Sequence, residues 1–486
     1  MLFNSINFLL FFVFVFFLYW YLQKEVKFQN ILLFLSSYLF YSFWDWRFLF
    51  MLFFSTFLDF SLGIQLQNTD KLKKKKFLLF IGIFVNLFVL SLFKYYNFFA
   101  ISFGEFLNHL GFKVNLQTLN LIIPVGISFY TFHGISYLID IYNNKTIADK
   151  SFINYAVFVS FFPLLIAGPI ERATHLLPQI QKKRVFSYSK SVDGLRQILW
   201  GLFKKIVIAD NCSVLVDEIF NNSSELNGNI LFLGAILFAF QIYGDFSGYT
   251  DIALGLARLL GFELMQNFSF PYFSRDIAEF WRKWHISLSS WFRDYVYIPL
   301  GGSKGGKFYI IRNVFIIFIL SGFWHGASWT FIFWGFLNAL YFIPYLLLSR
   351  NRKYLDVVAY NTILPNIKEI LSILFTFFLT SIAWIFFRST SIMQAFHFVK
   401  KIFFDLLDFS LYKVTLNYFR IHIGIIIVFY IFFFLIIEWK GRRGKFALSH
   451  YDHIKSSFVK YSFYIFIIFS IIIFSGNENQ FIYFQF

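Results

Sequence analysis

Long apolar runs recur along this chain. Four of the clearest cover Phe8–Leu22, Phe77–Phe93, Phe308–Leu320 and Ile421–Ile437. A helix needs about 20 mainly apolar residues to cross the hydrocarbon core of a bilayer, where the backbone must satisfy its own polar groups. Only 14% of the residues are charged, below the roughly one quarter that is usual in soluble domains. The sequence therefore predicts an all-α, multi-pass membrane protein and excludes a soluble globular fold.

The positive charge is concentrated in short loops between these runs. The formal net charge is +17, which in a soluble protein would suggest a nucleic-acid partner. Here the lysines and arginines gather at 71–76, 182–184 and 440–445, as expected for cytoplasmic loops. We therefore expect membrane lipids as partners and no nucleic acid. Counting spans from these loops predicts both termini outside the cytoplasm, with the first apolar run retained as a span.

The single cysteine limits the chemistry of the chain. Cys212 alone excludes an intrachain disulfide and a cysteine-rich metal site. It is either a small buried apolar residue or a nucleophile. Because no paired-histidine or aspartate-rich ligand pattern occurs, we expect no metal.

The irregular features of the chain gather in its middle. Residues 1–110 and 366–486 consist of spans and short loops, whereas residues 120–345 hold most Pro-Gly breaks, such as Pro124–Gly126 and Ile298–Gly302. Broken backbone at membrane depth persists only where protein or water satisfies its polar groups. We therefore predict one membrane domain, 1–486, with a catalytic core at 120–345 whose re-entrant segments line a cavity.

One histidine stands inside an apolar run. His325 lies between Trp324 and Gly326 in the segment 321–327. A polar group at membrane depth is costly without partners, so an ionisable residue there is a functional candidate. A neutral imidazole can take a proton from a hydroxyl near neutral pH. His325 is therefore the candidate catalytic base.

A second histidine, His285, lies in the aromatic and basic segment Phe280–Gly302. Its apolar residues fall near helical spacing: Trp281, Trp284, Leu288, Trp291 and Tyr295. Its basic residues lie largely elsewhere: Arg282, Lys283 and Arg293. The pattern predicts one amphipathic helix, which either lies in the cytoplasmic interface or enters the membrane to line a tunnel. His285 is then either a hydrogen-bonded structural residue or part of the site.

Two aspartates and a lysine are candidates for supporting roles. Asp245 and Asp251 follow an apolar run, where they could orient a histidine, hold an arginine or tie helices together as charge pairs. Lys304 lies in the glycine-rich segment Gly301–Lys307, which lacks the spacing of a nucleotide-binding P-loop. That segment is either a flexible connection or a contact for the phosphates of a coenzyme.

Several of these segments together resemble one known family. The runs 241–262, 267–302 and 321–335, which hold both histidines, are similar to the membrane-bound O-acyltransferase family. The similarity is closest to the bacterial branch that includes the alginate O-acetylation acyltransferase and the peptidoglycan O-acetylating membrane protein. Three further segments also resemble that branch: 124–140, 160–172 and 384–388.

This resemblance implies a fold and a pair of site residues. The fold is a bundle of about eleven or more spans around a tunnel, which joins a cytoplasmic donor site to an extracytoplasmic funnel. His325, in the Trp-His-Gly motif, is implied to be essential, and His285 to lie on the same tunnel. The membrane is then the bacterial inner membrane, with both termini in the periplasm.

The resemblance also implies an activity. An acyl group, expected to be acetyl, passes from a cytoplasmic thioester such as acetyl-CoA to a hydroxyl outside. The acceptor is a cell-surface polysaccharide, either peptidoglycan or an alginate-like glycan, or a periplasmic partner acyltransferase that resembles SGNH hydrolases. His325 acts as general base or briefly carries the acyl group. We expect no bound cofactor.

The remaining candidate residues have expected roles around this chemistry. Groups near Trp324 and Gly326 are expected to stabilise the oxyanion, and basic residues to meet the phosphates of the donor. The supporting residues of the tunnel and donor site are predicted to be Trp284, Trp324, Gly326, Asp245, Asp251, Arg282, Lys283, Arg293 and Lys304.

Two other functions stay open from the sequence. D-alanyl transfer to teichoic acid, with a carrier protein as donor, fits the same resemblance. A polysaccharide or lipid transporter would also have many spans and broken helices, but transporters usually show paired repeats. No such repeat is visible in the sequence. Substrate flux independent of both histidines would indicate transport.

Overall fold

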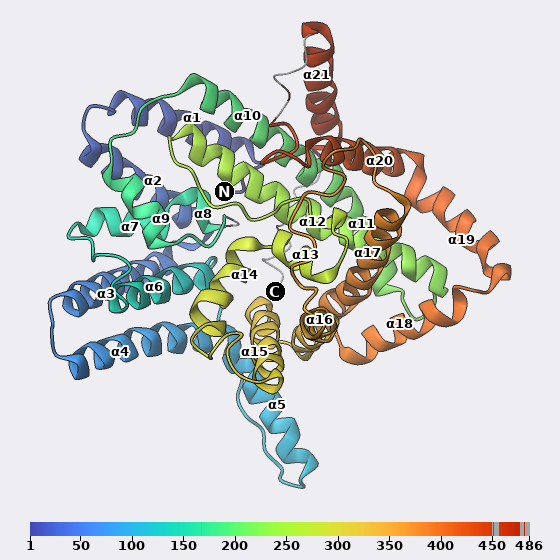
Figure 1. Cartoon of the computed structure of the whole chain (residues 1–486), viewed down its shortest axis with the longest axis horizontal. Coiled ribbons are helices and arrows are strands. Elements are labelled where there is room, and N and C mark those ends of the chain that lie inside the picture. Colours follow the sequence, from blue (N-terminus) through green and yellow to red (C-terminus); the bar gives the residue numbers. More distant parts are fainter. Residues whose placement is uncertain (167, 450, 452–455, 477–480, 482–486) are drawn as a thin grey trace. The chain divides into compact units, whose positions relative to one another are not determined.

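The computed structural model describes residues 1–166, 168–449, 451, 456–476 and 481. Among these residues every regular element is helical (Figure 1), so the predicted all-α class is confirmed. By packing, the chain forms two compact units. The N-terminal unit comprises Met1–Ser191 and Leu256–Met265, and the C-terminal unit comprises Val192–Gly255 and Gln266–Phe486. The single domain predicted from the sequence stays a prediction.

Eight helical stretches of the described chain are long and apolar enough to cross a membrane. They are Val26–Gln67, Leu72–His109, Gly228–Leu259, Lys307–His325, Trp329–Leu347, Ile367–Arg388, Gly424–Gly441 and Ser457–Phe474. The multi-pass prediction is thereby confirmed, whereas the number of crossings stays a prediction. The C-terminus was predicted to lie outside the cytoplasm. Residues 482–486, on which this prediction falls, lie outside the described residues.

The N-terminal unit is built from short and medium helices. Its elements are α1 (Ile6–Tyr21), α2 (Val26–Asp45), α3 (Leu49–Gln67), α4 (Leu72–Leu90), α5 (Tyr96–His109), α6 (Ile127–Tyr142), α7 (Phe152–Ser160), α8 (Phe162–Leu165) and α9 (Ala173–Gln181). Helix α6 is almost wholly buried. It approaches α3 closely because Gly134 has no side chain that would overlap the Asp59 carboxylate. Asn86 of α4 donates a hydrogen bond to that carboxylate over 2.7 Å, so a polar contact joins two apolar helices.

The C-terminal unit contains both candidate histidines. Its elements include α10 (Tyr188–Leu202), a π-helical segment at Phe203–Ala209, α11 (Asp210–Asn221), α12 (Gly228–Leu259), α13 (Ile277–Lys283), α14 (Ile286–Phe292), α15 (Lys307–His325), α16 (Trp329–Leu347), α17 (Ile367–Arg388), α18 (Ile392–Asp405), α19 (Tyr412–Tyr418), α20 (Gly424–Gly441) and α21 (Ser457–Phe474). The first residues of α10 and the last of α12 belong to the N-terminal unit.

Helices α15 and α16 pack closely at two glycines. A side chain on Gly322 would overlap the main-chain oxygen of Phe331, and one on Gly335 would overlap the main chain at Phe318. Small residues at such contacts let two membrane helices approach backbone to backbone. The pairing sets the last residue of α15, His325, against Trp334 of α16, with ring centroids 5.3 Å apart.

The segment Phe280–Gly302 is not the single amphipathic helix that its spacing predicts. Helix α13 ends at Lys283, and α14 begins only at Ile286. The two residues between them, Trp284 and His285, are non-helical. The break turns the chain so that an aromatic stripe predicted on one helix is divided between two short ones. Whether these helices enter the membrane from one side stays a prediction.

Candidate active site

The two histidines predicted from the sequence lie side by side in the C-terminal unit. The ring centroids of His285 and His325 are 6.1 Å apart. His285 is 1% exposed and His325 is 4% exposed. His325 comes from the end of α15 and His285 from the turn before α14. Two imidazoles from segments that are distant in sequence therefore lie close together in one buried region.

Aromatic rings enclose the histidine pair. Trp334 and Phe387 each lie 5.3 Å from the His325 ring, centroid to centroid. Trp324 lies 5.8 Å from the His285 ring, and the edge of Phe246 of α12 meets His285 at 4.7 Å. Rings packed in this way exclude water and lower the local dielectric constant, which strengthens electrostatic interactions with a reacting group.

A second layer of rings connects Trp284 to this enclosure. Trp284 is 1% exposed and lies 5.0 Å from Trp384, which in turn stacks on Trp334 at 5.5 Å. The predicted supporting residue Trp284 is therefore connected to His325 by a series of ring contacts through Trp384 and Trp334. The contact between Trp384 and Trp334 was not predictable from the sequence, because it requires the packing of α16 on α17.

His285 holds an unusual backbone conformation. Its φ is 43° and its ψ is 53°, in the left-handed region that costs a residue with a Cβ about 1–2 kcal/mol. Hydrogen bonds to Asn267 hold the turn: the Ile286 amide donates to the Asn267 main-chain oxygen over 2.9 Å. The Ser287 hydroxyl donates to the Asn267 side-chain oxygen over 2.9 Å. Asn267 was not predictable as a site residue from the sequence, since an isolated asparagine is more typical of an ordinary turn.

The His285 ring is neutral and open to hydrogen bonding. Burial lowers the pKa of His285 to about 3, because a charged imidazole would lose its hydration. Neither ring nitrogen has a hydrogen-bond partner among the described residues. The ring can therefore accept or donate a hydrogen bond when a polar group enters beside it.

Gly326 is a packing residue in this structure. Its backbone is extended, and a side chain there would overlap the ring of Phe331. Its N–H donates to the Gly322 main-chain oxygen over a long 3.4 Å. The predicted contribution of Gly326 to an oxyanion hole would require that weak bond to be given up.

A cleft of about 350 Å³ is lined by residues that are near both histidines in the sequence, although neither histidine lines it. Its walls include Ile286, which follows His285, and Ser321, which lies one turn before His325. Three arginines line it: Arg282, Arg293 and Arg352. The lining also includes Trp281, Phe318 and Phe342, so the cleft is largely apolar with guanidinium groups among its lining.

The predicted basic residues differ in their relation to this cleft. Arg282 lines the cleft, and its guanidinium donates to the main-chain oxygens of Asn351 and Tyr354, the latter over 2.6 Å. Lys283 instead pairs with Glu279 at 2.7 Å. Lys304 is exposed on the turn before α15 and does not line the cleft.

The two predicted aspartates pair with lysines of the π-helical segment. Lys204 contacts Asp251 at 2.5 Å, and Lys205 contacts Asp245 at 2.9 Å. Gln197 adds a hydrogen bond of 2.7 Å to Asp251. From the sequence, the aspartates could orient a histidine, hold an arginine or form charge pairs between helices. The contacts with Lys204 and Lys205 are charge pairs of the last kind. These contacts tie α12 to α10 and to the π-helical segment, and a role of the two aspartates toward the histidines stays a prediction.

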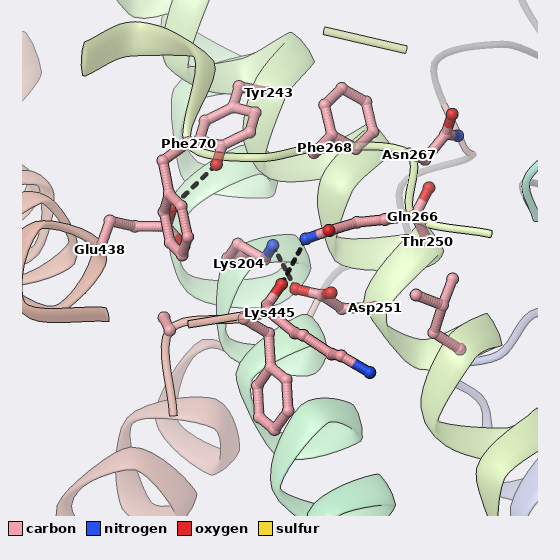
Figure 2. Close-up of a pocket in the computed structure, with 13 residues that line it drawn as sticks. Lys204, Tyr243, Thr250, Asp251, Gln266, Asn267, Phe268, Phe270, Glu438 and Lys445 are labelled. Atoms are coloured by element: carbon pink, nitrogen blue, oxygen red, sulfur yellow. Dashed lines mark hydrogen bonds and ion pairs between the residues drawn. The ribbon is translucent and has the colours of Figure 1, made fainter. Parts of the chain in front are cut away.

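A small polar cavity adjoins the Lys204–Asp251 pair (Figure 2). Its volume of about 20 Å³ is enough for roughly one water molecule. Tyr243 lines it and donates to Glu438 of α20 over 2.7 Å, as Figure 2 shows. Trp200 donates to the same carboxylate over 2.8 Å. Sequence reasoning missed this network, although two lysines in an apolar run were a sufficient signal.

Cys212 is fully buried in α11. Burial raises the pKa of its thiol to about 12, so the thiol stays protonated near neutral pH. Only the thiolate is a good nucleophile. The structure therefore favours the small buried apolar residue over the nucleophile.

Comparison with known proteins identifies the family. The profile of the membrane-bound O-acyltransferase family matches residues 143–389, a range that contains both histidines. The chain belongs to this family. It is thus an acyltransferase with several membrane helices, as the sequence motifs predicted, although the match does not itself test the role of any single residue.

Relatives in this family carry named activities. The chain is 37% identical over 404 residues to a probable alginate O-acetylase of Pseudomonas aeruginosa, covering 83% of this chain and 75% of the relative. It is 35% identical over 431 residues to the peptidoglycan O-acetyltransferase of Helicobacter pylori, covering 82% and 79%. It is 29% identical over 249 residues to the teichoic acid D-alanyltransferase of Bacillus subtilis, covering 48% and 62%.

Proposed function

We propose that this acyltransferase moves an acetyl group from a cytoplasmic thioester to a hydroxyl outside the membrane. The acceptor is a hydroxyl of a cell-surface polysaccharide, or of a periplasmic partner that completes the transfer. The relatives that match most of the chain are named as O-acetylases of alginate or peptidoglycan. The observation that carries the chemistry is the buried His285–His325 pair, 6.1 Å between ring centroids.

The proposed reaction uses His325 as general base. As the acceptor oxygen attacks the thioester carbonyl, its proton passes to the neutral imidazole, which then gives it to the departing sulfur. Alternatively, His325 takes the acyl group itself and the acceptor attacks the acyl-imidazole. His285 hydrogen-bonds a reacting group through a free ring nitrogen. The surrounding rings exclude water, which would otherwise hydrolyse the thioester.

The cleft lined by Ile286 and Ser321 is the proposed donor site. A coenzyme A thioester has an uncharged acyl-pantetheine arm and a phosphate-rich end. Arg282, Arg293 and Arg352 line a largely apolar cleft that also includes Ser321. Guanidinium groups bind phosphate through paired hydrogen bonds. Lys283 and Lys304, which do not line this cleft, are left out of the proposed contact.

The proposed location is the bacterial inner membrane, with both termini in the periplasm. The basic loops at 71–76, 182–184 and 440–445 support a cytoplasmic position for those segments. A periplasmic SGNH-hydrolase-like acyltransferase is the proposed partner, because the hydroxyl acceptor lies on the side opposite to the donor.

The experiment that tests this function follows acyl transfer in purified protein. The protein is reconstituted in liposomes with radiolabelled acetyl-CoA, and thioester cleavage and acyl transfer are measured. We expect His325→Ala to lose activity by at least about a thousand-fold, since it removes the base. His397→Ala, an exposed histidine on α18, is the matched control and should retain activity.

Two outcomes would contradict the proposal. Full activity in His325→Ala, with normal membrane expression, would show that this histidine is not the base. Turnover with an acyl carrier protein as donor, but none with acetyl-CoA, would favour D-alanyl-type transfer. The partial match to the teichoic acid D-alanyltransferase is the observation that keeps this second function open.

A further inference from the structure

A buried asparagine is hydrogen-bonded to the turn that contains His285. Asn267 lies in the non-helical segment after α12 and is 0% exposed. Its main-chain oxygen accepts from the Ile286 amide over 2.9 Å. Its side-chain oxygen accepts from the Ser287 hydroxyl over 2.9 Å and from the Ser287 amide over 3.4 Å. Asn267 therefore contacts the two residues that follow His285.

The same segment also holds the residues before His285. The Ser269 amide donates to the Lys283 main-chain oxygen over 3.0 Å. The ring of Phe268 meets Trp284 edge-on, with centroids 5.1 Å apart. Residues 267–269 thus bind the chain on both sides of His285. None of these hydrogen bonds reaches the imidazole, whose nitrogens stay available.

This attachment compensates for a strained conformation. His285 has φ 43°, in the left-handed region where a residue with a Cβ is unfavourable. Strained residues persist only where the surrounding structure determines them, and they cluster at functional sites. Without the Asn267 contacts, the turn would be free to relax, and the His285 ring would leave its place beside His325.

We propose that Asn267 is a positioning residue, whose two oxygens hold the left-handed turn that sets His285 against His325. This inference rests on the proposed acyl transfer. A displacement of about 1 Å at a catalytic group can cost about a hundred-fold in rate. Asn267 would then act on turnover through His285, without touching the donor or the acceptor.

The test measures acyl transfer in Asn267→Ala, with and without His285→Ala. We expect Asn267→Ala alone to lower kcat by about ten- to a hundred-fold, with little change in KM for the donor. In the His285→Ala background it should cause no further loss, because the group it positions is already absent. Ser287→Ala, which removes the hydroxyl bond to Asn267 and leaves the amide bond, should lower kcat by a smaller factor.

A control variant separates positioning from the general loss of a hydrogen-bonded, partly buried asparagine amide. Asn211→Ala removes hydrogen bonds from an asparagine to the main-chain oxygens of Ile206 and Val207, in the same unit but outside the site. It should leave kcat unchanged. Equal losses from Asn267→Ala in both His285 backgrounds would overturn the proposal, because they would indicate a structural defect that does not act through His285.

A second readout does not depend on turnover. A cryo-EM reconstruction of Asn267→Ala should show the 284–287 turn relaxed and the His285 ring displaced from His325. An unchanged ring position would overturn the positioning role, even if the wild type proved inactive with acetyl-CoA. Inactivity of the wild type with every donor would instead contradict the proposed function, so the two failures are distinguishable.

Discussion

At the scale of single residues, substitutions of His285 can distinguish the strain in its backbone from the chemistry of its imidazole. Glycine adopts φ 43° without the penalty of about 1–2 kcal/mol that a Cβ brings, at an entropic cost of about 0.5–1 kcal/mol. We therefore expect His285→Gly to be more stable than His285→Ala by up to about 1.5 kcal/mol. Both variants should lose most acyl transfer, because both lack the imidazole.

Thermal unfolding in detergent, measured alongside transfer activity, would check this pair of variants. The wild type provides the reference for both quantities. A lower unfolding midpoint for the glycine variant than for the alanine variant would show that the left-handed turn is not strained. It would also remove the reason for a residue that holds the turn from outside.

The histidines were predictable as residues, but their geometry was not. Intramembrane position and aromatic neighbours marked His325, and family resemblance added His285. The spacing of Trp281, Trp284 and Leu288 matches a helix, so the sequence predicted a continuous one. The break between α13 and α14 depends on contacts with Asn267. Periodicity reports which residues share a face and carries no information about such distant hydrogen bonds.

At the scale of the elements, the π-helical segment at Phe203–Ala209 is fastened to its neighbours by buried charges. Lys204 and Asp251 have side chains 3% and 14% exposed. Removing one partner of a buried pair leaves an uncompensated charge, which costs about 3–5 kcal/mol. We expect Asp251→Ala to lower the stability by that amount, and Lys204→Met with Asp251→Leu to recover most of the loss.

Thermal unfolding again measures the stability of each variant. The acyl-transfer activity of the folded fraction is measured alongside it. If Asp251 only ties helices together, the folded fraction of each variant should retain its turnover. A double variant as unstable as Asp251→Ala would contradict the charge-pair explanation. Loss of turnover without loss of stability would instead restore the alternative that this aspartate serves the histidines.

The helices themselves were largely predictable, and their partners were not. The apolar run predicted at Phe308–Leu320 lies within α15, and the run predicted at Ile421–Ile437 overlaps most of α20. Apolar length and composition suffice for such assignments. The approach of α15 to α16 depends on Gly322 and Gly335, whose significance appears only when two helices are already paired. Ion pairs such as Lys205–Asp245 are likewise tertiary.

At the scale of the whole molecule, the distribution of charge predicts which ends of the spans face the cytoplasm. Helix α4 is 19 residues long, which at 1.5 Å per residue is about 29 Å. The hydrocarbon core is about 30 Å thick, so the two ends of α4 should lie on opposite sides. The lysines at 71–76 lie at the start of α4, and α5 follows its other end and extends away from it (Figure 1).

Single-cysteine labelling tests this orientation directly. Because the chain has one cysteine, Cys212→Ser provides an unreactive background into which Lys74→Cys or Glu105→Cys is introduced. Both positions are exposed. In spheroplasts, a membrane-impermeant maleimide should label position 105 at once and position 74 only after permeabilisation, since basic loops stay in the cytoplasm. The reverse order would invert the proposed topology, and with it the sides assigned to the donor cleft and to the acceptor.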